Sequence, residues 1–450
     1  MEFEFKELVT VDEALRRWRE ALAAHVPPAP PVAVGLLDAL GLALAVPVTA
    51  AGDVPGFDRS TVDGFAVTAA DTYGASEAQP AYLTVSGEVP MGTAASVSVG
   101  PGEAVRVATG GMLPFGADAA LMVEHTEELP TGEIAASRPV SPGENIIRRA
   151  EDVAAGAIVL PAGHTLRPQD LGLLAAVGVS TVDVHRRPRV AVISTGDEIV
   201  APEQEPAPGQ VRDINSYALA GMIREAGAEP LLLGIVRDEP AALRDALTRA
   251  AAAADLVLIS GGSSVGSRDY VAAALTELGP PGILVHGLRV RPGKPTVLAV
   301  AGEVPVIGLP GHPASALVIF WLFGVVAIRH LRGAGAQLHI VPSVRARLAR
   351  HLPSSAGRED YVRVSLVPDP SAASAASAGP CPSTAAASAA ACAPSRAPAP
   401  PAFLAEPAFG LSGLINTLVR GDGLVRVPLG SEGLAAGTEV EVLLFGGWSR

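Results

Sequence analysis

The stretch LVLISGGSSVGSRDY, residues 256–270, decides the fold class of this chain. It opens with four apolar residues, 256–259, a run that is too short for a helix and is typical of a buried parallel strand. A glycine- and serine-rich turn and the start of a helix follow. Glycines let a ligand approach the backbone, and free amides at a helix N-terminus favour anionic oxygens. An ordinary strand–turn–helix connection explains the same residues, so both interpretations stay open.

Strand and helix patterns alternate through residues 189–330, which predicts a parallel sheet with helices on both faces. The predicted strands are 190–194, 231–236, 256–259 and 304–309. A polar turn follows each strand, and parallel strands end at one edge of a sheet, where such folds bind ligands. We therefore expect Glu198, Asp238 and Asp269 to lie together as site residues.

Helix signals also occur outside this alternation. Residues 10–13 have capping-box spacing and begin an amphipathic helix, and a second helical segment is predicted around 36–44. Asn215 is expected to cap a helix over 216–226. The strongest apolar run, 314–328, is shorter than the ~20 residues of a membrane span and predicts a buried helix.

Two other regions have β patterns. Short strands and turns in residues 82–140 predict a compact β domain. Residues 336–450 predict a small barrel or sandwich. An Ala/Ser/Pro-rich tract, 369–402, interrupts this last region; it offers nothing to bury in a core and predicts a disordered loop.

Three polar segments are candidates for ligand contact. Residues 52–67 place acids, an arginine and a serine close together between apolar strands, although exposed turns use the same residue types. Arg148 and Arg149, beside two acids, form either a self-neutralising surface cluster or an anion clamp. Arg291 and Lys294 stand on a stiff Pro/Gly frame, which lowers the entropy lost when they meet an anion.

Length, composition, net charge and cysteine count exclude several classes of function. A chain of 450 residues, 49% hydrophobic and 18% charged, can form roughly three or four domains with buried cores. A net charge of −13 argues against a general nucleic-acid binder, and an anionic substrate needs a local basic cluster or a metal. The only cysteines, Cys381 and Cys392, lie in the low-complexity tract and suit neither a disulfide framework nor a metal site. The charged N-terminus has no signal-peptide core, so we expect a cytoplasmic protein without membrane spans.

Nine motifs, in one order, resemble the MoeA-type molybdopterin molybdenumtransferases, the family that includes the E domain of gephyrin and of its plant counterpart. The motifs are FDRSTVDGFAV (57–67), VATGGMLPFGADAALMVE (107–124), NIIRRAEDV (145–153), VAVISTGDEIV (190–200), GIVRDEP (234–240), SGGSSVGSRDY (260–270), RVRPGKP (289–295), GLPGHPASA (308–316) and GREDYVRV (357–364).

The resemblance implies an elongated multidomain chain, α/β plus β. Its expected parts are a discontinuous N-terminal/linker domain (1–50 and 141–186), an inserted β domain (51–140), a MogA-like parallel α/β domain (187–335) and a C-terminal β-barrel (336–450) that carries the 369–402 loop.

The resemblance also implies the chemistry. Members of this family insert molybdate into adenylylated molybdopterin and release AMP and molybdenum cofactor in a Mg²⁺-dependent step. The same resemblance implies a homodimer with its site in a cleft between subunits, and a transient contact with a MogA-type adenylyltransferase. Hard carboxylate oxygens suit Mg²⁺.

Site residues carry over by motif position. The acidic and polar catalytic set is Asp63, Thr109, Asp152, Glu198, Asp238 and Asp269, of which Glu198, Asp238 and Asp269 are the expected Mg²⁺ ligands. The expected substrate-binding set is Ser60, Arg148, Gly261, Gly262, Ser263, Ser264, Arg291, Lys294, Pro295, Ser315, Arg358 and Ser412.

The chain departs from the family at two positions of interest. Arg291 and Lys294 replace a pair often written as two lysines, and His312, to which we assign no role, stands where asparagine is common.

Two alternative functions remain: a MogA-type molybdopterin adenylyltransferase, which would need only the α/β domain, and a non-catalytic scaffold, which would not need every acidic and basic site position.

Overall fold

The computed structural model describes residues 8–261, 267–277, 279–334, 341–370 and 401–446. These residues form two compact units. The first contains the chain up to Val32, residues 41–43 and the chain from Val184 onward; the second contains residues 33–40 and 44–183.

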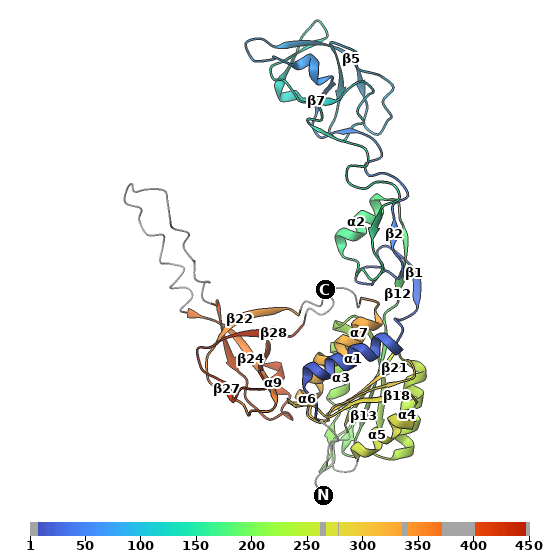
Figure 1. Cartoon of the computed structure of the whole chain (residues 1–450), viewed down its shortest axis with the longest axis vertical. Helices are drawn as coiled ribbons and strands as arrows, with labels where there is room; N and C mark the ends of the chain where they lie inside the picture. The colour runs from blue at the N-terminus through green and yellow to red at the C-terminus, as the bar shows by residue number, and fades with distance from the viewer. Residues whose placement is uncertain (1–7, 262–266, 278, 335–340, 371–400, 447–450) are drawn as a thin grey trace, which may run out of the picture. The chain divides into compact units, whose positions relative to one another are not determined.

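A six-stranded sheet organises the first unit (Figure 1). Its strand order is β16 (Glu229–Val236), β13 (Arg189–Thr195), β17 (Leu256–Gly261), β21 (Val304–Leu309), β20 (Val297–Ala301) and β18 (Pro281–His286). The predicted parallel α/β core is present, with β20 alone antiparallel to both of its neighbours. The four strands that precede the polar turns are parallel, so these turns do share one edge.

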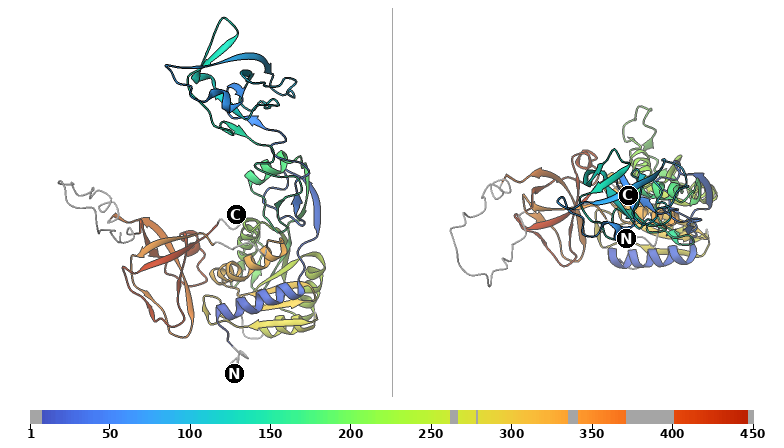
Figure 2. Two further views of the ribbon diagram at one scale, coloured as in Figure 1. Left: turned by 45° about the horizontal axis from the view of Figure 1, so that its top comes forward. Right: turned by 90° about the horizontal axis from the view of Figure 1, so that it is seen from above.

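Helices cover both faces of this sheet. The first face carries α1 (Val11–His25), α3 (Asn215–Glu225) and a long helix over 313–331, and the other carries α4 (Pro240–Ala253) and α5 (Ser267–Glu277). Figure 2 shows α1, in blue, lying along the yellow strands. Along β13, Val190 and Val192 belong to the first core, whereas Ala191 and Ile193 belong to the second. Burial on both faces explains why these strands have continuous apolar sequences.

The long helix is built from α6 (Pro313–Ile319), the π-helical segment η3 (Phe320–Gly324) and α7 (Val325–Leu331). It meets the length and hydropathy of a membrane span, but 72% of its most apolar window is buried inside the unit. The prediction of a buried helix is therefore confirmed. Helix α1 packs against it, and the Trp18 indole Nε1–H donates to the Phe323 carbonyl at 3.1 Å.

The C-terminal part is a closed barrel. Strands β24 (Glu359–Pro368), β25 (Phe403–Pro407), β22 (Ser343–Leu348), β28 (Glu439–Leu444) and β26 (Gly423–Val427) pair in that order, and β26 pairs back with β24. Outside the barrel, β19 (Val290–Arg291) adds to β24 in parallel, and β23 (Leu352–Pro353) pairs with β27 (Gly433–Leu434). The sequence patterns indicated four barrel strands and missed β25, which directly follows the Ala/Ser/Pro tract.

The second unit contains the predicted β domain. Its sheet order is β7 (Ala119–Met122), β4 (Gly64–Val67), β6 (Glu103–Val107), β5 (Ala81–Val89), β9 (Glu133–Ala136) and β8 (Thr126–Glu128). Short pairs join β3 (Arg59–Ser60) to β10 (Ile146–Ile147) and β2 (Val48–Thr49) to β11 (Ile158–Leu160), and α2 covers Pro168–Ala176. The ladder between β1 (Pro31–Gly35) and β12 (Thr181–His185) lies where the chain passes between the units.

Two helix predictions were wrong in detail. Residues 36–41 form turns and not a helix, because Gly41 adopts a left-handed φ of 75° that interrupts helical geometry. Asn215 is the first residue of α3 and not its cap; the Asp213 carboxylate accepts from the Ser216 backbone N–H at 3.1 Å in the capping role.

The predicted disordered loop is only partly within the described chain. Residues 371–400 lie outside it, and so do Cys381 and Cys392. At the tract's two ends, the Asp369 backbone N–H donates to the Ala402 carbonyl at 2.9 Å, and the Arg347 guanidinium contacts the buried Asp369 carboxylate at 2.6 Å. The barrel thus holds both ends of the tract together.

Replacing Trp18 by alanine should lower the free energy of unfolding of the first unit by about 3–5 kcal/mol, because the side chain is fully buried between α1 and the long helix. Trp18→Phe, which keeps most of the apolar volume but leaves the Phe323 carbonyl without its donor, should cost about 1–3 kcal/mol. Urea unfolding followed by circular dichroism measures both variants. Equal stability of wild type and Trp18→Ala would contradict this packing.

Replacing residues 371–400 by a short Gly/Ser linker should leave the melting temperature nearly unchanged, since the hydrogen bond and ion pair at the ends of the tract remain. Asp369→Ala serves as the sensitivity control and should lower the melting temperature, because it leaves Arg347 without this carboxylate. A large drop in the linker variant would show that the tract contributes to the folded core.

Candidate functional site

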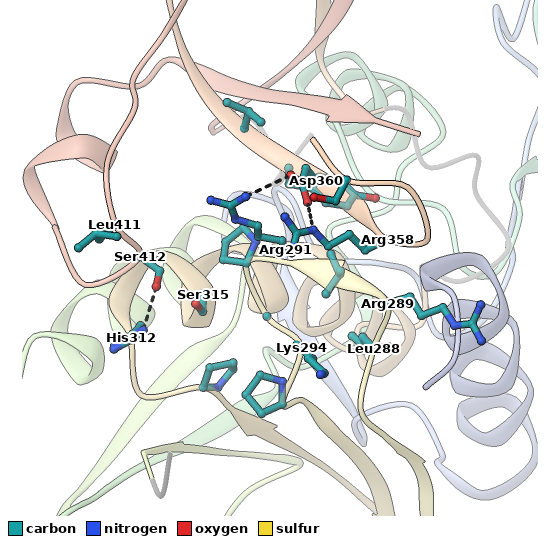
Figure 3. A pocket seen from close by; sticks show the side chains of 18 of the residues that line it. Leu288, Arg289, Arg291, Lys294, His312, Ser315, Arg358, Asp360, Leu411 and Ser412 are labelled. Atoms are coloured by element: carbon teal, nitrogen blue, oxygen red, sulfur yellow. Dashed lines mark hydrogen bonds and ion pairs between the residues drawn. The ribbon is translucent and has the colours of Figure 1, made fainter. Parts of the chain in front are cut away.

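A pocket of about 860 Å³ lies in the first unit, between the barrel and the α/β sheet (Figure 3). Six predicted substrate-binding residues line it: Arg291, Lys294, Pro295, Ser315, Arg358 and Ser412. They come from three of the nine motifs and, for Ser412, from a fourth segment outside them, and the fold brings them together. Three lining residues to which we gave no role, His312, Asp360 and Arg363, also lie here.

A glycine fixes the backbone conformation of the loop that carries Arg291 and Lys294. Gly293 adopts a φ of 120°, and a Cβ there would come within 2.5 Å of the Ile319 side chain, so only glycine fits. The Thr296 hydroxyl donates to the Gly293 carbonyl at 2.7 Å, and the Leu288 N–H donates to the Lys294 carbonyl at 2.9 Å. These hydrogen bonds fix the bend of the loop from which the Arg291 and Lys294 side chains extend.

One buried carboxylate orients the two arginines. The Asp360 side chain is 4% exposed; the Arg358 Nε–H donates to its Oδ1 at 3.1 Å, and Arg291 Nη1 lies 3.7 Å from its Oδ2. The Arg358 and Arg291 side chains are 36% and 62% exposed, so neither is fully enclosed by its contact with Asp360. Four arginines and Lys294 against the lining carboxylate of Asp360 leave the pocket cationic, which suits a dianionic oxyanion.

Glu359, the residue before Asp360, holds this wall of the pocket in place. Glu359 is buried and accepts from the Arg426 Nε–H at 2.8 Å and from the Tyr361 hydroxyl at 3.3 Å. Burial and the adjacent Glu359 charge raise the pKa of Tyr361 above its usual range, so its hydroxyl stays a donor. Arg426 also reaches the Asp12 carboxylate of α1 at 3.2 Å, which ties the barrel to the first helix.

The opposite wall contains a contact between the barrel and α6. Ser412 Oγ lies 2.8 Å from His312 Nδ1, and the Ala314 backbone N–H donates to the Ser412 carbonyl at 3.1 Å. Within the barrel, the Arg363 guanidinium donates to the Gly410 carbonyl at 2.9 Å and fixes the start of the same loop. The predicted Ser412 thus occupies a defined place on the pocket rim.

A second group lies at the C-terminal edge of the sheet. The Thr195 hydroxyl donates to Asp238 Oδ1 at 2.5 Å, and the Asp238 backbone N–H donates to Asp197 Oδ1 at 3.4 Å. The Glu198 carboxylate folds back over Gly196, where a Cβ would come within 2.7 Å of Oε2. Two predicted acids, Glu198 and Asp238, are therefore in neighbouring turns.

Asn215 links this edge to the pocket, a role that the sequence did not indicate. Its Nδ2 donates both to Ser260 Oγ at 2.7 Å and to the Gly311 carbonyl at 2.8 Å, from a side chain that is almost fully buried. Ser260 precedes the glycine stretch, and Gly311 lines the pocket. A buried amide with two such bonds fixes the relative position of both turns.

Part of the glycine motif is outside the described chain. Gly261 ends β17, whereas Gly262, Ser263 and Ser264 lie beyond the described residues. Asp269 belongs to the first turn of α5, but its side chain is not described. Among the described residues, no group of three or more His, Cys, Asp or Glu side chains is arranged to hold a metal ion.

The other predicted residues belong to the second unit, where three motif segments meet. Asp63 Oδ1 accepts from the Thr109 N–H at 2.8 Å, and Ser60 exchanges backbone hydrogen bonds with the Gly110–Gly111 turn. The Asp152 N–H donates to the Val54 carbonyl at 3.1 Å. The exposed Asp63, Thr109, Arg148 and Asp152 side chains are thus carried on hydrogen-bonded loops.

The two adjacent arginines of this unit differ. Arg149 Nε donates to Asp53 at 2.6 Å, and the Ala155 backbone N–H together with Arg149 lowers the pKa of the Asp53 carboxyl. Arg149 is thus paired with an acid from a distant segment. The predicted Arg148 makes a backbone hydrogen bond to Glu151 at 2.7 Å.

Family models match most of the chain. Residues 9–178 match the MoeA N-terminal region (domains I and II), residues 191–330 a probable molybdopterin binding domain, and residues 400–445 the MoeA C-terminal region (domain IV). The chain belongs to the MoeA family. The predicted fold class, a MogA-like α/β domain with an inserted β domain and a C-terminal barrel, is confirmed.

Named relatives agree with this assignment. The chain is 40% identical to the molybdopterin molybdenumtransferase of Nostoc over 74% of its own length and 76% of the relative's. It is 36% identical to molybdopterin molybdenumtransferase 2 of Mycobacterium tuberculosis over 78% and 86% of the two chains. A crystal structure of the Pyrococcus horikoshii molybdopterin biosynthesis MoeA protein matches with a TM-score of 0.77 and 35% identity, and covers 98% of this chain and 100% of that one.

Replacing Arg291 or Arg358 of this MoeA-family chain by glutamine should weaken oxyanion binding by about 10- to 100-fold, the effect of losing a charge-assisted hydrogen bond. Isothermal titration with molybdate measures this change. Arg345→Gln is the matched control, because Arg345 is an exposed barrel arginine that pairs with Glu439 outside the pocket. Equal affinity in all four proteins would remove the pocket from anion binding.

Proposed function

We propose that this chain inserts molybdate into adenylylated molybdopterin and releases AMP and molybdenum cofactor. The observation that carries the proposal is the cationic pocket, in which Arg291, Arg358 and Lys294 stand opposite Ser315 and Ser412. Supporting it, relatives that are 40% and 36% identical to this chain are named molybdopterin molybdenumtransferases.

The pocket residues would act by binding and orientation. Molybdate and a pyrophosphate group are both oxyanions that accept hydrogen bonds and donate few. The forked guanidinium groups of Arg291 and Arg358, aimed by Asp360, can each donate two parallel N–H bonds to such oxygens. Lys294 adds a compact charge, and the serine hydroxyls add neutral donors. Donors that are fixed before binding lower the cost of reorganisation as negative charge shifts during transfer.

Mg²⁺ fits the acids at the strand edge. Their donors are hard carboxylate oxygens, the ligand type that Mg²⁺ prefers. Glu198 and Asp238 would hold the ion, with Asp269 from the start of α5. When bound, the cation would offset negative charge at the phosphoanhydride. The role of Thr195 is to hold the Asp238 carboxylate through its 2.5 Å hydrogen bond.

The remaining proposals come from the family resemblance. Ser60, Asp63, Thr109, Arg148 and Asp152 are proposed as further site residues, and their loops are rigidly hydrogen-bonded. The chain is proposed to work as a cytoplasmic homodimer that receives its substrate from a MogA-type adenylyltransferase. Light scattering of the purified chain tests the dimer, and a monomer at working concentrations would contradict it.

Single-turnover AMP release tests the activity. Purified protein receives adenylylated molybdopterin, Mg²⁺ and molybdate, and AMP and cofactor are measured together. The proposal expects AMP release that depends on molybdate, with cofactor formed. Tight binding of the adenylylated pterin without release would indicate a scaffold, and ATP consumption with unmodified molybdopterin would indicate an adenylyltransferase.

Asp269→Asn should keep the fold and lower molybdate insertion by at least about tenfold, because an amide oxygen is a weaker Mg²⁺ ligand than a carboxylate. The control is Glu277→Gln, which changes an exposed acid at the other end of the same helix, paired with Arg244. Cofactor yield is the measurement. A normal yield from Asp269→Asn would remove this residue from the mechanism.

A further inference from the structure

On the pocket rim, the Ser412 hydroxyl lies within hydrogen-bond distance of the His312 imidazole. The two side chains meet at 2.8 Å between Oγ and Nδ1, and both line the pocket beside Ser315 (Figure 3). The position of the Ser412 backbone does not depend on this contact, because the Ala314 N–H holds its carbonyl at 3.1 Å. The side-chain pair therefore controls only where the hydroxyl group points.

His312 is itself held from several directions. Its carbonyl accepts from the Ser315 and Ala316 N–H groups, each at 3.0 Å, where α6 begins. The preceding carbonyl, of Gly311, accepts from the buried Asn215 amide at 2.8 Å. Prolines stand on both sides of the Gly-His pair. With its backbone fixed, the ring has little freedom to lose when a ligand arrives.

Whether His312 Nδ1 carries a proton decides whether the Ser412 hydroxyl can donate a hydrogen bond to a ligand. A serine hydroxyl has one proton, and a deprotonated oxyanion only accepts hydrogen bonds. If Nδ1 has no proton, the hydroxyl donates to the ring and turns its lone pairs to the pocket, which repels an anion. If Nδ1 carries a proton, the hydroxyl accepts from the ring and is free to donate to the ligand.

We infer that His312 is a positioning residue of the anion pocket: its Nδ1–H directs the Ser412 hydroxyl proton to the bound oxyanion. The inference rests on the proposed function, because it takes the ligand to be an oxyanion. It needs no charge on the imidazole, since the neutral Nδ1–H tautomer is a sufficient donor. Net charge on the pocket wall comes instead from its four arginines and Lys294, offset by Asp360.

Molybdate titration of the full chain, at one pH and salt concentration, tests the inference. His312→Ala should weaken molybdate binding about 3- to 10-fold, the loss of roughly one neutral hydrogen bond. His312→Asn should bind within about twofold of wild type, because an asparagine amide reaches the Nδ1 position with a permanent N–H donor. In a Ser412→Ala background, His312→Ala should change nothing further, since its target is gone.

A spectroscopic readout separates orientation from simple support of the loop. Long-range ¹H–¹⁵N spectra of histidine-labelled protein, assigned with His312→Asn, report which ring nitrogen carries the proton. The inference expects a protonated Nδ1 in the molybdate complex, and an unprotonated Nδ1 overturns it. This measurement uses the wild-type protein and decides the matter even if His312→Ala fails to fold.

The outcomes also separate this inference from the proposed function. If Ser412→Ala binds molybdate as wild type does, Ser412 does not contact the ligand and the inference fails, whereas the pocket itself is tested by Arg291→Gln and Arg358→Gln. If Ser412→Ala is weak while His312→Ala binds normally, or if the two losses simply add, the pocket stands and only the role of His312 is wrong.

Discussion

The pocket depends on a very short piece of backbone pairing. Strand β19 pairs in parallel with β24 over two residues, Val290 with Glu359 and Arg291 with Asp360, and the Glu359 N–H donates to the Arg289 carbonyl at 2.8 Å. This ladder joins a loop of the α/β part to the beginning of β24, the barrel strand that carries Asp360. It places the Asp360 carboxylate beside Arg291, which comes from a distant motif, whereas Arg358 meets the same carboxylate from two residues away along the chain.

Hydrogen bonds and ion pairs of buried polar groups, and not apolar packing, then fix the positions of the pocket walls relative to this pairing. Asp360 and Glu359 point their carboxylates to different partners, one toward the pocket arginines and one toward Arg426. On the far wall, Asn215 fixes two turns with one amide. The Asp360, Glu359 and Asn215 side chains are themselves buried, and a low dielectric around them strengthens the hydrogen bonds that they make. The site is therefore rigid where a ligand must be recognised.

The sequence predicted the sheet well because both of its faces are buried, and a run such as residues 256–259 then has no polar member to hide the signal. It predicted the pocket cations because Pro and Gly mark their loop. It missed Asp360 and Asn215 because their roles depend on partners more than 60 and 40 residues away, at Arg291 and Ser260, which no local pattern encodes. The helix predicted at 36–44 failed because residue type alone does not show that Gly41 takes a left-handed φ.

Strand β24 has a practical consequence for studying the protein. It runs from the pocket at Asp360 to Pro368, a separation of roughly 26 Å at about 3.3 Å per residue, and the tract with both cysteines of the chain begins just beyond it. A thiol-reactive dye or surface linker would attach only through that tract, because the chain has no other cysteine. The native chain therefore has a built-in labelling handle, so fluorescence or immobilised binding assays need no engineered cysteine.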